Sequence, residues 1–271
     1  MPRSYLDNLL TTHRLRKATL TSIIKALQLP AAGKGLDVGC GAGLQCMMLA
    51  KTLGPDGHVT GLDIAPEFLS HGEKLVGEAG LSGRITFVEG RADNLPFADD
   101  SFDWVWSSDC VGYGPWEPMP MLMELRRIVR PGGTIAILAW SSEHLLPGYP
   151  RLEALLGATI PGLAPFKAGL DPSRHFQRSL GLLRELGLEN RRAQTFCGSV
   201  FAPLDDEQFQ GLEALIDMRW PNAAKELDTD DRLLFERITD PRSDDFILRH
   251  RDYHAFFTYS MFRGEVANIV T

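Results

Sequence analysis

The stretch "GLDVGCGAGLQ", residues 35–45, decides the fold of this chain. A short β-rich run that contains Asp37 leads into glycines at three alternate positions, Gly39, Gly41 and Gly43. Glycine at this density indicates a backbone that passes close to another group. The amphipathic run "LQCMMLAKTL" follows at once, so the glycines are expected to form a turn between a strand and a helix.

Strand and helix patterns alternate from this turn as far as Trp140. Such alternation predicts an α/β fold with a mostly parallel sheet, helices on both faces and right-handed crossovers. The last strand of the region, "TIAILAW", is apolar throughout, as expected for a strand buried on both faces. The strands are expected over 35–40, 58–64, 84–90, 101–109 and 134–140, and the helices over 44–53, 66–80 and 117–130.

The pattern changes after Trp140, where Gly and Pro become frequent. Two further strands are expected over 192–202 and 252–264, joined by a helical excursion of about fifty residues, far longer than a hairpin needs. The second helix of this excursion has Thr229 as its expected N-cap. We interpret the excursion and the preceding Gly/Pro segment as a lid. The expected organisation is one domain over 1–271, with N-terminal helices in 1–32, a ligand-binding core in 33–140 and lid segments in 141–190 and 203–250.

Composition and charge narrow the classes of function. The chain has 271 residues and a formal charge of −7, values typical of a soluble globular protein. It has no Lys/Arg run, so nucleic-acid binding is not expected. No apolar run approaches the roughly 20 residues of a membrane span, and the N-terminus lacks a secretory pattern. Four cysteines without metal-type spacing predict free thiols, no metal site and a cytoplasmic location.

The glycine spacing separates three classes of ligand. A dinucleotide fingerprint needs a third glycine where this chain has Leu44, and a phosphate loop needs Gly-Lys-Ser/Thr, whereas Gly43 precedes Leu-Gln. Pyrophosphate binding is therefore disfavoured, although an NAD(P)-dependent oxidoreductase on a similar sheet stays as an alternative. Asp37 would repel an anion and suits a ligand that carries positive charge.

The pattern resembles the first motif of the class I S-adenosylmethionine-dependent methyltransferases, acid-x-Gly-x-Gly-x-Gly. The resemblance extends in order through "GLDIA", which contains Asp63, through "EGRADNLPFADDSFDWVWSSD", and through "VRPGGTIAI". It covers about residues 33–140. It implies a Rossmann-like sheet of seven strands in the order 3-2-1-4-5-7-6, with an antiparallel seventh strand.

The resemblance also implies a role for individual residues. Gly39 and Gly41 would let the backbone approach the methionine part of S-adenosylmethionine, with Asp37 ordering the loop. Asp63 would hold the ribose hydroxyls, which a carboxylate accepts well. The backbone of Ser108 would face the methionine part. The full set of cofactor-binding residues implied is Asp37, Gly39, Gly41, Asp63, Ile64, Arg91, Ala92 and Ser108.

One residue departs from the family pattern. Where Arg91 stands, this branch often has an Asp that accepts from the adenine amino group, and Arg cannot accept a hydrogen bond. Two alternatives follow. Either the neighbouring Asp93 accepts from the adenine, or the adenine is held by stacking and by backbone groups such as the Ala92 amide.

The chemistry implied is an in-line displacement, for which the protein aligns the groups and excludes water. A general base is needed only if the acceptor must lose a proton. His144, just past the expected fifth strand, is the candidate for this base. The alternative is that His144 is simply a histidine in a surface loop. Cys110 is interpreted as a plain thiol. His13 and Arg14 are candidates for closing the outer side of the cofactor site. An apolar or aromatic acceptor, or simply a core under the lid, would explain Tyr113, Trp116, Met119, Tyr149 and Phe166.

The sequence therefore predicts a methyltransferase that uses S-adenosylmethionine and acts on a small, apolar or aromatic molecule. Alternatives are the oxidoreductase above and a protein that binds S-adenosylmethionine without transferring its methyl group. No membrane partner is expected, and a homodimer is left open. The pattern does not specify the acceptor or the atom that is methylated.

Overall fold

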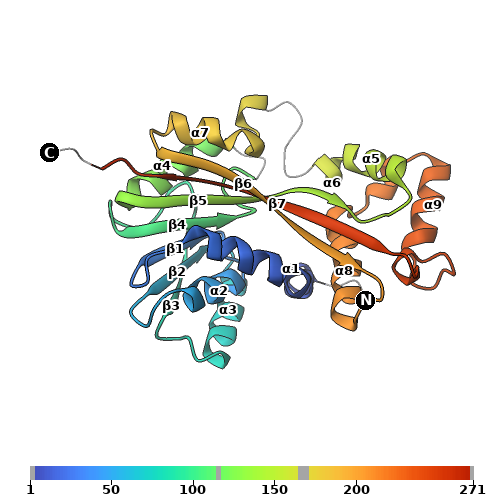
Figure 1. The fold of residues 1–271 in the computed structure, drawn as a ribbon, viewed down its shortest axis with the longest axis horizontal. Helices are drawn as coiled ribbons and strands as arrows, with labels where there is room; N and C mark the ends of the chain where they lie inside the picture. Colours follow the sequence, from blue (N-terminus) through green and yellow to red (C-terminus); the bar gives the residue numbers. More distant parts are fainter. Residues whose placement is uncertain (1–3, 114–116, 164–170, 269–271) are drawn as a thin grey trace. The chain divides into compact units, whose positions relative to one another are not determined.

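A computed structural model describes residues 4–113, 117–163 and 171–268 (Figure 1). Its elements are, in chain order, α1 (Tyr5–Leu27), β1 (Lys34–Val38), α2 (Leu44–Thr52), β2 (His58–Asp63), α3 (Pro66–Glu78), β3 (Ile85–Glu89), β4 (Phe102–Ser108), α4 (Pro118–Ile128), β5 (Val129–His144), α5 (Pro150–Ala158), α6 (Ile160–Leu163), the short 3-10 helices η1 (Pro172–Arg174) and η2 (Phe176–Arg178), α7 (Ser179–Glu185), β6 (Glu189–Phe201), α8 (Asp206–Arg219), η3 (Ala223–Glu226), α9 (Thr229–Thr239), η4 (Ile247–Arg249) and β7 (His254–Glu265).

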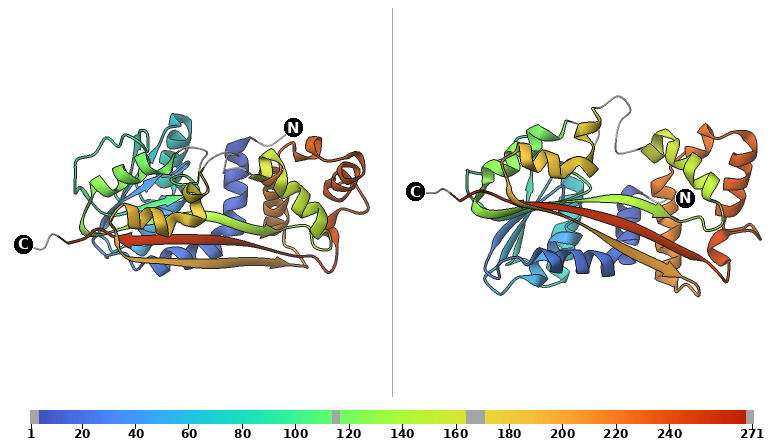
Figure 2. Two further views of the ribbon diagram at one scale, coloured as in Figure 1. Left: turned by 90° about the horizontal axis from the view of Figure 1, so that it is seen from above. Right: turned by 45° about the horizontal axis from the view of Figure 1, so that its top comes forward.

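The strands form one seven-stranded sheet in the order β3-β2-β1-β4-β5-β7-β6, which confirms the predicted order. The pairs among β1 to β5 are parallel, so that Leu36 of β1 lies opposite Thr60 of β2 and Val105 of β4. The long strands β5, β7 and β6 lie side by side (Figure 2). The chain thus forms the expected Rossmann-like sheet.

Backbone hydrogen bonds show that β7 runs antiparallel to both of its neighbours. Gly132, near the start of β5, donates to the carbonyl of Val266, just past the end of β7, at 2.8 Å. Ala202, just past the end of β6, donates to the carbonyl of Tyr253, just before β7, at 2.9 Å. In both pairs the start of one strand meets the end of the other.

The chain divides into two compact units. Unit 1 takes in the described residues of Met1–Thr19, Ser141–Ala168 and Cys197–Thr258, and unit 2 those of Leu20–Trp140, Gly169–Phe196 and Tyr259–Thr271. Four elements contribute residues to both units: α1, β5, β6 and β7. The organisation of 1–271 as a single domain stays a prediction.

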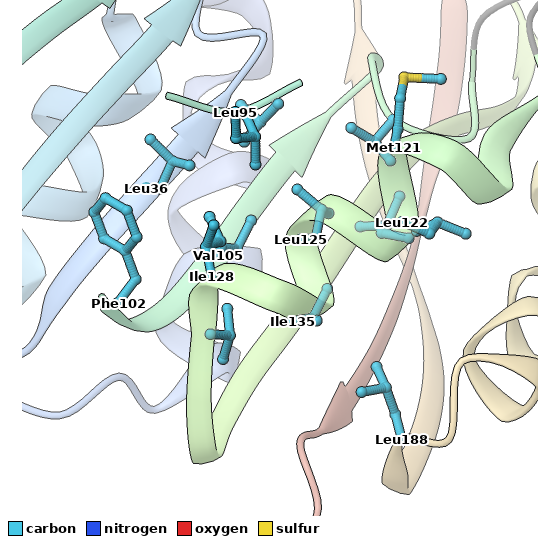
Figure 3. Close-up of a cluster of buried hydrophobic side chains, with 14 of the residues drawn as sticks. Leu36, Leu95, Phe102, Val105, Met121, Leu122, Leu125, Ile128, Ile135 and Leu188 are labelled. Atoms are coloured by element: carbon cyan, nitrogen blue, oxygen red, sulfur yellow. The ribbon is translucent and has the colours of Figure 1, made fainter. Parts of the chain in front are cut away.

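One face of the sheet in unit 2 carries its main hydrophobic core (Figure 3). Side chains alternate across a strand, so Leu36 and Val38 of β1 point to the same face. They lie in one cluster with Val105 of β4 and with Leu122 and Leu125 of α4, all essentially inaccessible to solvent. Burying each such side chain stabilises the fold by about 1.5–3 kcal/mol, so α4 is firmly fixed on this face.

The opposite face of β1 is shaped by a glycine. A Cβ atom at Gly35 would lie 2.0 Å from the ring of Trp104, which occupies the space a side chain would need. Two residues along β4, the indole of Trp106 donates to Gln45 Oε1 of α2 at 2.9 Å. Both tryptophans are therefore buried packing residues of the sheet.

Polar contacts organise unit 1 around its helices. Asp205 caps α8 by accepting from the Gln208 amide, and Gln208 accepts from the Asp205 amide in return, a complete capping box. At the other end of α8, Arg219 forms an ion pair of 2.9 Å with Glu143 of β5, and both side chains are largely buried. These contacts anchor both ends of α8.

Two local predictions need correction. The side chain that caps α9 is Asp228, which accepts from the Asp231 amide at 2.9 Å, and Thr229 is the first residue of the helix. β5 extends from Val129 to His144, well beyond the expected range 134–140, so His144 is its last residue. The two errors have different physical sources: either Asp or Thr can cap a helix, and pairing with β7 lengthens β5.

In the described part of the chain, no helix is long and apolar enough to cross a membrane. Nor do the described residues contain a group of three or more His, Cys, Asp or Glu side chains placed to hold a metal ion. The four cysteines are free thiols, as predicted.

We expect Gly35→Ala to destabilise unit 2 by about 3 kcal/mol or more, because a methyl group there overlaps the Trp104 ring. Gly181→Ala in α7 is the matched control, since a Cβ at Gly181 meets open space and alanine favours a helix by roughly 1 kcal/mol. Urea denaturation followed by circular dichroism should show opposite shifts of the midpoint. Equal midpoints for the two variants would contradict the packing of Trp104 on Gly35.

Candidate functional site

The carboxyl ends of β1, β2, β3 and β4 meet at one edge of the sheet in unit 2. In open α/β sheets this edge is where ligands bind. The strands end there at Val38, Asp63, Glu89 and Ser108. The sequence-predicted residues that the fold brings to this edge are Asp37, Gly39, Gly41, Asp63, Ile64, Arg91, Ala92 and Ser108.

The glycine turn after β1 adopts a backbone that only glycine tolerates well. Gly39, Gly41 and Gly43 have φ angles of 76°, 53° and 69°. A Cβ at Gly39 would lie 2.5 Å from the Sγ and Cβ atoms of Cys110, and one at Gly43 would lie 2.4 Å from the ring of Phe87. A Cβ at Gly41 would meet nothing within 4 Å. Gly39 and Gly43 therefore serve packing, whereas Gly41 borders open space.

Asp63, at the end of β2, fixes this turn. Its Oδ2 accepts from the Gly41 amide at 2.7 Å and its Oδ1 from the Ala65 amide at 3.0 Å. The amides of Gly39 and Cys40 donate to the Leu62 carbonyl at 2.8 and 3.0 Å. A carboxylate offers about four acceptor positions, so Asp63 retains capacity for further donors. The turn is thus set in place before any ligand arrives.

Asp37 has a different environment from Asp63. It is 2% exposed and lies on the α2 side of β1, where the Cys46 thiol donates to its Oδ2 at 3.2 Å. Burial raises the pKa of Asp37 to about 7, and the nearby charge of Asp63 adds to the increase. The carboxyl is therefore about half protonated near neutral pH. The family resemblance implies that Asp37 orders the glycine loop, whereas the carboxylate that accepts from a loop amide is that of Asp63.

Ile64 and Ala92 offer an apolar surface and a backbone donor beside Asp63. Ile64 is 62% exposed, a high value for a large aliphatic side chain that directly follows a strand. Ala92 lies in the tight turn that follows β3, closed by a bridge between Arg91 and Asn94. Its amide donates to no residue in the described part of the chain. Such a pair can hold a flat ring by stacking and one hydrogen bond.

Arg91 and Asp93 form a two-pronged ion pair. Arg91 Nε donates to Asp93 Oδ1 at 2.9 Å, and its Nη2 donates to Asp93 Oδ2 at 2.7 Å. The pairing lowers the pKa of the Asp93 carboxyl through the hydrogen bond with Arg91. Each Asp93 oxygen accepts one hydrogen bond from Arg91, but a carboxylate offers about four acceptor positions, so both of the expected ways of holding the adenine stay open.

The turn after β4 completes the edge. The Ser108 hydroxyl is buried and has no hydrogen-bond partner among the residues described. The next residue, Asp109, has a φ of 51°, and its Oδ1 accepts from the Trp140 amide at 2.7 Å. Burial raises the pKa of Cys110 to about 12, so its thiol is protonated, in agreement with its reading as a plain thiol. The Ser108 hydroxyl is thus a buried polar group at this edge with no partner among the described residues.

Glu124 and Arg127 of α4 are a pair that the sequence analysis missed. Glu124 Oε2 accepts from the Leu95 amide at 2.8 Å. Arg127 donates to the carbonyls of Leu95 and Phe97 at 3.1 and 2.7 Å, while pairing with Glu124 and Asp99. The pair clamps the loop that carries Ala92. The pair is difficult to recognise in the sequence because Glu124 and Arg127 bind backbone groups about 30 positions away.

Some predicted residues lie elsewhere or outside the described part of the chain. His144, Tyr149, His13 and Arg14 belong to unit 1. Trp116 and Phe166 lie outside the residues that the structure describes. In unit 2, Met119 packs against the hydrophobic core and the Tyr113 ring lies 5.4 Å from that of Phe176. Of the two explanations expected from the sequence, an acceptor surface or a packed core, the structure supports a packed core for Met119.

A comparison with family models matches residues 36–133 to a methyltransferase domain. Demethylmenaquinone methyltransferase of Bacillus velezensis is 35% identical over 197 residues, covering 66% of this chain and 81% of the relative. The protein of the same name from Bacillus subtilis is 30% identical with the same coverage. These matches set aside the oxidoreductase alternative.

Solved structures show the same fold at low identity. The YcgJ protein of Bacillus subtilis aligns with a TM-score of 0.58 and 15% identity, covering 93% of this chain and 99% of that one. A phosphoethanolamine N-methyltransferase of Haemonchus contortus, solved with S-adenosylhomocysteine, aligns with a TM-score of 0.58 and 14% identity, covering 96% of this chain and 57% of that one.

The buried carboxyl of Asp37 predicts a pH dependence of stability. Its pKa is 3.8 when unperturbed and about 7 in the folded chain, so below pH 3.8 the group is neutral in both states. As pH rises from 4 to 7, Asp37 ionises first in the unfolded chain. The folded state therefore loses up to about 4 kcal/mol of stability relative to the unfolded state. Above pH 7 the loss is constant.

Asp37→Asn removes this titration, so its stability relative to the wild type should increase between pH 4 and 7. Urea denaturation at pH 4.5, 6 and 7.5 measures the difference. Asp100→Asn, at an exposed turn position, is the matched control and should leave the wild-type pH profile unchanged. Parallel profiles for Asp37→Asn and the wild type would contradict the neutral buried carboxyl.

Proposed function

Because this chain belongs to the class I S-adenosylmethionine-dependent methyltransferases, we propose that it methylates a small aromatic acceptor of the hydroquinone type. The observation that carries the acceptor class is the similarity to two demethylmenaquinone methyltransferases across four fifths of their length. A ring of this kind also agrees with the apolar or aromatic acceptor expected from the sequence.

The residues at the edge of unit 2 fit the cofactor of the family. S-adenosylmethionine supplies a methyl group on a positively charged sulfur, which makes that methyl group electrophilic. We propose that the free acceptor capacity of Asp63 takes the ribose hydroxyls and that exposed Ile64 covers the adenine. The Ala92 amide would donate to the adenine ring.

The glycine turn and the end of β4 would receive the methionine part. Gly41 borders open space, and a side chain there would fill the position that a ligand needs. The buried hydroxyl of Ser108 supplies a hydrogen-bonding group that has no partner in the described chain. Asp37 would act from beneath the turn, since it is buried and bonded to Cys46.

We expect calorimetric titration to show that the protein binds S-adenosylmethionine. Asp63→Asn should weaken binding by about 10- to 100-fold, because hydrogen bonds to a charged group are worth about 1.5–3 kcal/mol. Asp56→Asn, which changes an exposed turn acid of unit 2, is the control and should bind like the wild type. Absence of any binding by the wild type would refute the cofactor site.

The acceptor class is tested by incubating the protein and S-adenosylmethionine with a reduced naphthoquinone under anaerobic conditions. Mass spectrometry should show one added methyl group on the reduced ring, because its electron-rich carbons and oxygens are nucleophiles. The oxidised quinone should stay unchanged. Phosphoethanolamine is the comparison acceptor, and methylation of that amine without methylation of the hydroquinone would overturn the proposed class.

A further inference from the structure

Unit 1 contains a surface hollow of about 360 Å³ where β5 ends, next to the start of β7. Its volume lies at the lower end of the range for small-molecule sites. Leu146, Pro147 and Pro150 give it apolar walls, and Leu146 is completely buried beneath it. One hydrogen-bonded pair, His144 with Glu153, faces the same hollow. An apolar hollow with a few polar groups is the usual form of a ligand site.

Glu153 is held rigidly in this hollow. Its Oε1 accepts from the backbone amides of Leu145 and Leu146 at 2.5 and 2.7 Å, and its Oε2 lies 3.1 Å from His144 Nδ1. The side chain of Glu153 is only 10% exposed, whereas that of His144 is 55% exposed. The two amides fix the carboxylate, and the carboxylate in turn fixes the imidazole.

The contact with Glu153 determines which nitrogen of His144 can accept. A carboxylate accepts hydrogen bonds and does not donate them, so the neutral imidazole donates from Nδ1. Its Nε2 then carries a lone pair and acts as an acceptor. No partner for Nε2 occurs among the described residues. The hollow therefore offers an oriented acceptor, His144 Nε2, beside apolar walls and a second histidine, His254.

Aromatic rings extend the surface beside this acceptor. The His144 ring lies 4.7 Å from the Phe256 ring at an interplanar angle of 42°, and the His254 ring lies 6.3 Å from Phe256 at 36°. His254 and Phe256 are two apart on β7, so their side chains point to the same face of the sheet. Such a row of rings suits a flat aromatic ligand.

We propose that this hollow binds a planar aromatic ring that carries a hydroxyl group, with the hydroxyl donating its hydrogen bond to His144 Nε2. Glu153 acts as a positioning residue, because it fixes the tautomer of His144. The site stands on the geometry of unit 1 alone. Identification of the bound ring as the methyl acceptor rests on the proposed function.

The test measures binding of three probes of similar shape to the full chain: 2-naphthol, naphthalene and 2-methoxynaphthalene. The first donates a hydrogen bond, the second neither donates nor accepts through a substituent, and the third only accepts. We expect the wild type to bind 2-naphthol about tenfold more tightly than either of the others, the effect of one oriented hydrogen bond. Equal affinities, or no binding of any probe, would overturn the proposal.

Two variants separate hydrogen bonding from packing. His144→Phe keeps an aromatic ring and removes the acceptor, so the preference for 2-naphthol should disappear while naphthalene binding persists. In Glu153→Gln the amide oxygen can still accept from the two backbone amides, which turns its NH₂ group toward Nδ1. Nε2 then becomes a donor. Because the hydroxyl oxygen and the methoxy oxygen can both accept from it, the preference for 2-naphthol over 2-methoxynaphthalene should disappear while both bind more tightly than naphthalene. Nitrogen-15 shifts of His144 report the same change of tautomer.

His58→Phe is the matched control, since this histidine lies in unit 2, where its Nε2 contacts Thr86. Its probe preference should equal that of the wild type. A preference for 2-naphthol that survives His144→Phe would overturn the proposal. Calorimetry with S-adenosylmethionine on the same wild-type sample keeps the two ideas distinct, because loss of cofactor binding refutes the proposed function without changing the probe preference.

Discussion

The hydrogen bond from the Gly41 amide to Asp63 is the interaction on which the rest of the site depends. It ties the turn after β1 to the end of β2, and the same carboxylate also holds the amide of Ala65, one residue before α3 begins. A single side chain therefore sets the glycine turn and the entry to the next helix. Such preorganisation lowers the cost of ordering the site when a ligand binds. The glycines make the turn sterically feasible, and Asp63 selects its conformation.

The two acids at this edge show how location decides the role of a carboxyl group. Asp63 is the last residue of β2 and Asp37 the next-to-last residue of β1, yet Asp37 is buried beside a thiol and Asp63 is partly open to solvent. Desolvation disfavours charge on Asp37, whereas amide donors surround Asp63. A second preorganised element, the clamp of Glu124 and Arg127, supports the adjoining loop from α4. The edge is thus built from backbone groups held by charged side chains.

Periodicity was sufficient to predict the sheet, because each buried strand and amphipathic helix has its own local pattern. The order of strands and the meeting of Asp63, Arg91 and Ser108 at one edge came from family resemblance as well as pattern. Local pattern could not choose Asp228 over Thr229 as a cap, nor show that Arg91 engages Asp93. Both the choice of the capping residue and the pairing of Arg91 with Asp93 depend on side-chain geometry. The clamp and the pairing of His144 with Glu153 depend on contacts that no spacing rule encodes.

The high pKa of Cys110 has a chemical consequence for an enzyme that handles an alkylating agent. Its sulfur lies where a side chain on Gly39 would be, within the turn proposed to receive the reactive sulfonium. A thiolate is a strong nucleophile, but burial raises the pKa of the Cys110 thiol to about 12, so this thiol is protonated at neutral pH. Burial beside Asp63 and Asp37 thus keeps this thiol protonated next to the proposed cofactor site, where a thiolate would compete with the acceptor for the methyl group.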